Sequence, residues 1–283
     1  MKLHAILITR NDDLIIEDWL ERHHHMFDTI AVVDGSDGDF TRTACAPYPN
    51  IRYGTDPASP ITDQTLRHHG FELLRGDITE GDWIFNAHPD EFLVHDPHSF
   101  MDLPWNLFLW LPLHILPHTS EMDAWHAMGG RRPIALFRHF WWRRGRLPHC
   151  ELRMWRFVRE PVWDLENPKP SSEVIPMNYL GEPLPNCMPI YLHFKCYDPR
   201  PEMYEADGRA KRSQLETGVP GRSAGEGFFF DEEHPYMEEG EVWNVARFTS
   251  VADLLTRFGN PPRVIHDDQG KPHMVNHLGQ GVH

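Results

Sequence analysis

The sequence is poor in cysteine and contains no long apolar run. It has 4 cysteines in 283 residues, none of them in a Cys-x-x-Cys pair, which excludes a zinc ribbon or a thioredoxin motif and favours a reducing, cytoplasmic location. The longest apolar stretch, 105–117, is shorter than a bilayer span and is interrupted by Pro112 and His114, so we expect no transmembrane segment. The first residues read as a strand rather than a signal peptide.

Positive charge is also scarce. Lysine and arginine number 27 against 42 aspartates and glutamates, for a net charge of -15, which argues against a general nucleic-acid binder. A phosphate-bearing ligand would therefore need a local positive site or a metal. Hydrophobic residues reach 40% and aromatics 12%, which is typical of a globular protein with a sizeable core.

The pattern of apolar residues predicts an α/β fold with a mostly parallel central sheet flanked by helices. Later segments are less regular and predict an irregular α+β C-terminal portion. In the first part we expect strands at 3–9, 29–33, 51–54 and 83–87 and helices at 13–27 and 59–76; later, strands at 107–115, 133–137, 152–157 and 190–194, helices at 199–215 and 251–258, and a loop at 217–240.

Polar residues follow three of the predicted strands. They are Arg10-Asn11-Asp12, the acidic loop from Asp34 to Asp37, and His88-Pro89-Asp90-Glu91. Ligands bind beyond the carboxyl ends of parallel strands, so these groups should converge on one sheet edge. A buried carboxylate is costly without a partner, so Asp90 and Glu91 require a cation, a ligand or solvent. Taken alone, each acidic stretch could also be an ordinary turn.

The order of these motifs resembles the family 2-like glycosyltransferases of the GT-A fold. Three features carry this resemblance: the strand ending in Arg10-Asn11, the acidic loop at Asp34, and the run GDWI followed by DEFL from Asp90. The branch with the motif Asp-x-Asp-Glu-Phe is most similar, and here that motif reads His-Pro-Asp-Glu-Phe. The likeness covers roughly the first 100 residues, with a weaker echo at 191–199.

The resemblance implies a GT-A-like, or Rossmann-like, domain that binds a nucleoside diphosphate sugar and a divalent metal, Mn²⁺ or Mg²⁺. Carboxylates and the diphosphate can share such a cation, which stabilises the charge of the departing diphosphate. It places Asp90 first among the metal ligands and His193 second. The donor pocket would be lined by Asp34, Asp37, Arg10 and Asn11.

His88 departs from the family pattern, which has an aspartate at this position. We include it among the predicted metal ligands, although a neutral imidazole adds no negative charge and shifts the preference toward Mn²⁺ or Zn²⁺. An inverting transfer also needs a base for the acceptor hydroxyl. Glu151, which precedes a predicted strand, is the first candidate, and Asp164 is the second.

The sequence and its resemblance together predict a glycosyltransferase that moves a sugar to a glycan or another hydroxyl acceptor, with no nucleic-acid partner. Within a single domain, residues 1–100 would bind the donor, 101–216 the acceptor, and 217–283 would form a C-terminal loop and helix extension. Two alternatives stay open: a metal-dependent hydrolase or nucleotide-binding protein on a similar scaffold, and a non-catalytic relative of a transferase, for which His88 is the main argument.

Overall fold

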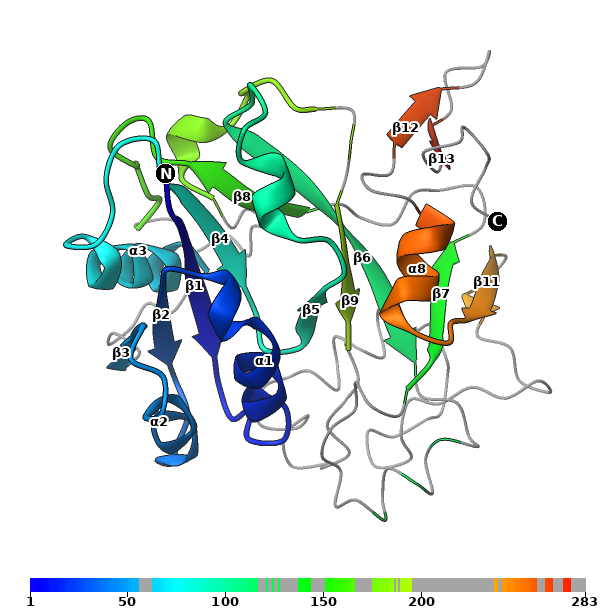
Figure 1. The fold of residues 1–283 in the computed structure, drawn as a ribbon, viewed down its shortest axis with the longest axis horizontal. Helices are drawn as coiled ribbons and strands as arrows, with labels where there is room; N and C mark the ends of the chain where they lie inside the picture. Colours follow the sequence, from blue (N-terminus) through cyan, green and yellow to red (C-terminus); the bar gives the residue numbers. More distant parts are fainter. Residues whose placement is uncertain are drawn as a thin grey trace.

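Four parallel strands form the first part of the sheet, in the order β4-β1-β2-β3. They are β1 (Leu3–Thr9), β2 (Thr29–Asp34), β3 (Ile51–Thr55) and β4 (Trp83–Ala87) (Figure 1). The structure is a computed structural model that describes residues 1–55, 63–116, 121, 124, 127, 137–143, 151–165, 175–185, 187, 189–194, 237–238, 241–258, 263–266 and 272–275.

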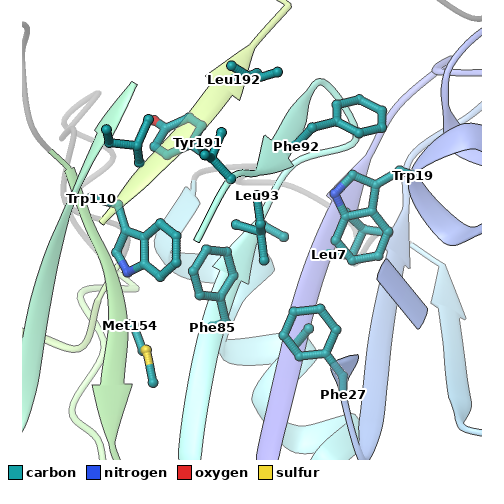
Figure 2. Packing of buried hydrophobic residues seen from close by; sticks show 14 of the residues in the cluster. Leu7, Trp19, Phe27, Phe85, Phe92, Leu93, Trp110, Met154, Tyr191 and Leu192 are labelled. Atoms are coloured by element: carbon teal, nitrogen blue, oxygen red, sulfur yellow. The ribbon is translucent and has the colours of Figure 1, made fainter. Parts of the chain in front are cut away.

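Strand β1 is buried along its whole length, which shows that both faces of the sheet are covered at this strand. Its side chains alternate between the faces, as strand geometry requires. Leu7 belongs to a large core that includes Trp19 of α1 (Ile16–His23), shown in Figure 2. Ile6 faces the other way and packs with Phe71 of α3 (Asp63–Leu74). The two helices therefore lie on opposite faces, which explains why β1 is apolar at nearly every position.

Later strands extend the sheet mostly by antiparallel pairing. β8 (Glu151–Arg156) pairs with β4 and with β6 (Leu107–Leu116). Among the described residues, 11 strands belong to this sheet, and two further strands form a separate hairpin. β5 (Glu91–Leu93) pairs antiparallel with β9 (Ile190–His193), which also runs parallel to β6. The strand that begins inside the HPDEF motif, at Glu91, thus pairs with a strand from about a hundred residues later in the chain.

The other elements are shorter or lie toward the end of the chain. They are α2 (Phe40–Cys45), α8 (Val251–Phe258), the 3-10 turns η1 (His24–Met26), η2 (Pro97–Phe100) and η3 (Met177–Tyr179), and the strands β7 (His139–Arg143), β10 (Met237–Glu238), β11 (Glu241–Arg247), β12 (Arg263–His266) and β13 (Pro272–Val275). Among the described residues, no helix combines the length and the apolar character needed to cross a membrane.

The predicted α/β sheet flanked by helices is confirmed, with the parallel pairing concentrated in its first four strands. The strand predicted over 133–137 falls mainly outside the described residues, and Phe137 precedes β7 instead of ending a strand. The predicted helix at 199–215 also lies outside them. The division into donor and acceptor halves stays a prediction.

Candidate functional site

The carboxyl ends of the parallel strands lie next to one another at one edge of the sheet. Thr9 of β1 is paired with Asp34 of β2, and Asp34 in turn with Thr55 of β3. On the other side, Leu7 pairs with Ala87, the last residue of β4. The three polar loops therefore begin side by side, as the sequence pattern predicted.

Asp34 organises the loop after β2 and borders a cavity. Its Oδ1 accepts from the Ser36 backbone N–H at 2.9 Å, and its Oδ2 accepts from the Tyr53 hydroxyl at 2.5 Å. Burial, followed by this hydrogen bond to Asp34, raises the pKa of Tyr53. The cavity has a volume of about 200 Å³ and is lined by Asp34, Ser36, Asp37, Gly38, Asp39, Arg42, Tyr53 and Thr55. This volume is below the range of about 300–1,000 Å³ for a whole-ligand pocket, so it suits one part of a ligand.

Asn11 joins the loop after β1 to this acidic loop. Its Nδ2 donates to Asp37 Oδ2 at 3.1 Å, and its Oδ1 accepts from the Asp37 backbone N–H at 3.0 Å. Asn11 adopts φ of 56°, a left-handed conformation that asparagine tolerates better than most residues. Arg10 is exposed on the same turn. The structure therefore gives Asn11 and Asp37 a shared role in shaping the edge.

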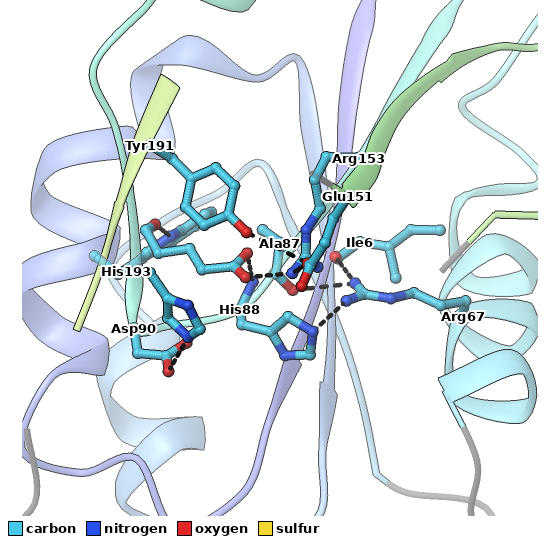
Figure 3. Close-up of polar contacts among 11 residues, drawn as sticks. Ile6, Arg67, Ala87, His88, Asp90, Glu151, Arg153, Tyr191 and His193 are labelled. Carbon is cyan, nitrogen blue, oxygen red and sulfur yellow. Dashed lines mark hydrogen bonds and ion pairs between the residues drawn. The ribbon is translucent and has the colours of Figure 1, made fainter. Parts of the chain in front are cut away.

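Glu91, the second acid of the motif, points into the protein and meets a buried arginine. Arg153 Nη2 donates to Glu91 Oε1 and to Glu151 Oε2. Figure 3 shows Arg153 beside Glu151. Glu91 and Arg153 are each 3% exposed, and Oε2 of Glu91 accepts from the His88 backbone N–H at 3.2 Å. Burial raises the pKa of Glu91 to about 7, although the charge of Arg153 acts in the opposite direction. The sequence pattern required a cation, a ligand or solvent for the acidic pair, and for Glu91 the structure supplies a cation, Arg153.

Asp90 instead faces His193 of β9. The distance between Asp90 Oδ2 and His193 Nε2 is 3.3 Å, and both side chains are partly exposed, at 23% and 16%. The Phe194 backbone N–H donates to the Asp90 carbonyl at 2.8 Å, which ties the two segments together. Burial alone would lower the pKa of His193, but the charge and hydrogen bond of Asp90 raise it above its usual value.

Asp90, Glu91 and His193 each offer a ligand atom within 4.8 Å of the other two, so this group could hold a metal ion. Both oxygens of Glu91 already accept hydrogen bonds from Arg153 and His88, which leaves Asp90 and His193 as the residues best suited to ligate. One carboxylate oxygen and one imidazole nitrogen fit Mn²⁺ or Zn²⁺ better than Mg²⁺, which prefers oxygen ligands. The donor set therefore fits a transition-type divalent ion.

His88 does not fit the third ligand position that was predicted for it. Its Nε2 lies 2.9 Å from Nη2 of Arg67, a fully buried residue of α3. Arginine can only donate, so the Nε2 lone pair is engaged and not directed at a metal. Burial, together with the nearby charges of Arg67 and Arg153, lowers the pKa of His88 well below its usual value. We therefore remove His88 from the candidate ligand set.

The two predicted bases lie in different surroundings. Glu151 joins the buried cluster, where its Oε2 also accepts from the Tyr191 hydroxyl at 3.3 Å, and its side chain is 22% exposed. Asp164 is placed elsewhere, with its backbone N–H donating to Gln64 Oε1 at 3.4 Å in the first turn of α3. Glu151 is thus the candidate base that the fold brings to Asp90 and His193.

Three side chains of this edge were not singled out from the sequence. Arg153 could have been found, because Glu151 and Arg153 are two residues apart on one strand and share a face. Tyr53 and Arg67 could not, since nothing in a single sequence shows that they reach Asp34 and His88 from other elements.

No family model and no curated protein matches the chain. A crystal structure of 4-diphosphocytidyl-2C-methyl-D-erythritol synthase aligns with 41% of this chain at 16% identity and a TM-score of 0.30, and the alignment spans only 60% of that protein. HddC from Yersinia pseudotuberculosis aligns over 68% of this chain and 90% of its own length, at 7% identity and a TM-score of 0.33. Similarities this weak assign neither a family nor an activity.

Proposed function

We propose that this protein is a nucleotide-dependent transferase that moves a sugar from a nucleoside diphosphate sugar to a hydroxyl acceptor. The observation that carries the proposal is the juxtaposition, on one sheet edge, of the Asp34 cavity with the Asp90–His193 pair. A ligand with a nucleoside at one end and a diphosphate at the other has the chemistry that these two places would bind.

The nucleoside would occupy the cavity after β2 and β3, where Asp37, Tyr53 and Thr55 offer polar groups. The diphosphate would extend toward β4 and β9, where Asp90 and His193 would hold a divalent cation. A cation there would neutralise the charge that develops on the departing nucleoside diphosphate. In a chain with a net charge of -15, buried Arg67 adds local positive charge behind His88, where its printed partners are carbonyl oxygens and an imidazole and not carboxylates.

Glu151 would act as the base in an inverting transfer. Arg153 and Tyr191 both contact its Oε2, so they fix the orientation of the carboxylate, while the side chain stays partly exposed. A carboxylate held in this way can accept the proton of an acceptor hydroxyl that lies within hydrogen-bonding distance. Asp164, near the start of α3, is the second candidate base.

Thermal-shift measurements with UDP, GDP and CMP, each with and without Mn²⁺, test the proposal. We expect one nucleoside diphosphate to raise the melting temperature by about 2 °C or more, and to do so more strongly with Mn²⁺. Asp90→Asn should remove the Mn²⁺-dependent part and leave the metal-independent part in place. His25→Gln is the matched control, because His25 is exposed in η1, just before the amino end of β2.

The absence of any shift with every nucleotide would contradict the proposal. Consumption of a nucleotide sugar without an added acceptor would instead indicate a hydrolase. Binding without turnover of any kind would indicate a non-catalytic nucleotide-binding protein.

A further inference from the structure

Arg67 reaches from α3 to the ends of two strands and to His88. Its Nη1 donates to the carbonyl oxygens of Ile6 in β1 and Ala87 in β4, and its Nη2 lies 2.9 Å from His88 Nε2. The Arg67 side chain is fully buried, so solvent does not compete for these contacts. Arg67 therefore anchors the backbone that leads into the HPDEF motif and the imidazole at its first position.

This contact determines which nitrogen of His88 carries the proton. A guanidinium has only donors, so His88 Nε2 must accept, and the single proton of the neutral imidazole must then sit on Nδ1. The hydrogen bond from a charged group also polarises the ring and strengthens Nδ1–H as a donor.

The Nδ1–H group is available to a ligand. None of the described residues accepts a hydrogen bond from it, and it is not among the fully buried polar atoms that lack a partner. His88 as a whole is half-buried, and its ring lies between Asp90 and Arg67 in Figure 3. The donor therefore sits beside the proposed cation site without belonging to it.

We propose that His88 is a neutral hydrogen-bond donor to a phosphate oxygen of the nucleoside diphosphate, and that Arg67 is the residue that positions it. This inference rests on the proposed function, because it needs a diphosphate at this edge. A carboxylate at position 88 would repel a diphosphate unless a cation lay between them. An imidazole N–H binds the same oxygen directly, so the histidine changes the way in which the ligand is held.

Substitutions at His88 separate the two ring nitrogens. His88→Gln can place an oxygen near Arg67 but has no donor at the Nδ1 position. His88→Asn keeps a donor there, because its amide nitrogen is bonded to Cγ as Nδ1 is. Against the nucleoside diphosphate that the wild type binds best, we expect His88→Gln to weaken affinity by about tenfold or more. His88→Asn keeps the donor but loses the Arg67 contact, so we expect it to weaken affinity by less than His88→Gln does.

Two controls belong to the titrations, which use the full chain with Mn²⁺. The matching nucleoside without phosphates should bind wild type and His88→Gln equally, and His25→Gln should behave as wild type. As a single substitution, Arg67→Lys should weaken binding of the diphosphate. The double variant, Arg67→Lys with His88→Gln, should bind the diphosphate no more weakly than His88→Gln does. Additive losses would mean that Arg67 does not act through His88.

Nuclear magnetic resonance of the ¹⁵N-histidine-labelled wild type tests the same inference without relying on variants that fold. We expect the His88 ring to be protonated on Nδ1, and that proton to shift with UDP or GDP but not with uridine or guanosine. Protonation on Nε2, or diphosphate affinity unchanged in His88→Gln, overturns this inference and leaves the proposed function standing. If the wild type binds no nucleoside diphosphate, both fail.

Discussion

Asn11, two residues after the end of β1, has a backbone φ of 56°, which few residues other than glycine adopt. Its side chain is hydrogen-bonded to Asp37. Asn11→Gly would lose the pair but relax the backbone, whereas Asn11→Val would lose the pair and strain the backbone. We therefore expect the valine variant to have a free energy of unfolding lower than the glycine variant by about 1–2 kcal/mol, measured in urea. Equal losses would mean that the left-handed turn carries no strain.

His23 is a buried histidine that bridges α1 to β5. Its Nε2 accepts from the Leu93 backbone N–H at 3.1 Å, so Nδ1 is the donor to the Trp19 carbonyl at 3.0 Å. Burial lowers the pKa of His23 from 6.5 to about 3. Between these values the unfolded chain binds a proton that the folded protein does not, so the contribution of His23 to stability is present above pH 6.5 and is lost as the pH falls toward 3.

The expected result is a pH-dependent loss of stability that His23→Gln reduces. Between pH 7 and pH 5, the wild type should lose roughly 2 kcal/mol more unfolding free energy than the variant. Urea unfolding at the two pH values measures this difference, in which the other titrating groups cancel. His25→Gln, at an exposed position, should follow the wild type. Parallel pH profiles for wild type and His23→Gln would show that His23 is not the group that titrates.

At the scale of elements, the seating of α3 on the sheet depends on Gly70. A Cβ at Gly70 would lie 2.3 Å from Ile6 Cγ2, a branched atom close to the β1 backbone. Gly70→Ala would gain helix propensity of about 1 kcal/mol but force α3 away from the sheet, so we expect a net loss of roughly 1–3 kcal/mol in unfolding free energy. Gly76→Ala, where a Cβ meets nothing within 4 Å, should be close to neutral. Equal effects would contradict the tight helix–sheet contact.

The elements predicted correctly are those with a clear pattern of apolar residues, either a continuous run or a helical period. β1, β2 and β4 are continuous apolar runs because both of their faces are buried, and α1 places Ile16, Trp19 and Leu20 on one face. The elements that were missed are short or appear late in the chain. β5 has only 3 residues and takes its strand character from pairing with β9, which no local pattern shows. α2, with 6 residues, and the β12–β13 hairpin, with 4 residues in each strand, were also missed, because elements this short show no clear apolar period.

The candidate site was predictable to the extent that it depends on strand ends. Because parallel strands end at one edge, Asp34 and Asp90 could be placed together from the sequence. The structure also brings Glu151 to that edge, where it shares Arg153 with Glu91. The partners themselves were not predictable, since Glu91 and Arg153 are 62 residues apart and Arg67 and His88 are 21 apart on different elements. The contact between Arg67 and His88, which argues against the predicted metal role of His88, could not be foreseen either.

At the scale of the whole molecule, an acidic chain brings two buried arginines to the edge where its acidic loops meet. Arg153 compensates Glu91 and Glu151, and Arg67 orients His88, so Asp90 and His193 are the pair best placed to meet a ligand. This division explains how adjacent acids in one motif can have different roles. Glu91 belongs to the structure of the site, and Asp90 to its proposed chemistry.

The central claim is that Asp90 and His193 bind one divalent cation beside a nucleoside diphosphate. Anomalous diffraction at the manganese edge tests it most directly, with crystals of the full chain grown with Mn²⁺ and the nucleotide that stabilises the protein most. We predict one manganese peak in contact with Asp90, His193 and the diphosphate. An ordered nucleotide with no manganese at these side chains, and with the Asp90–His193 hydrogen bond intact, would contradict the claim.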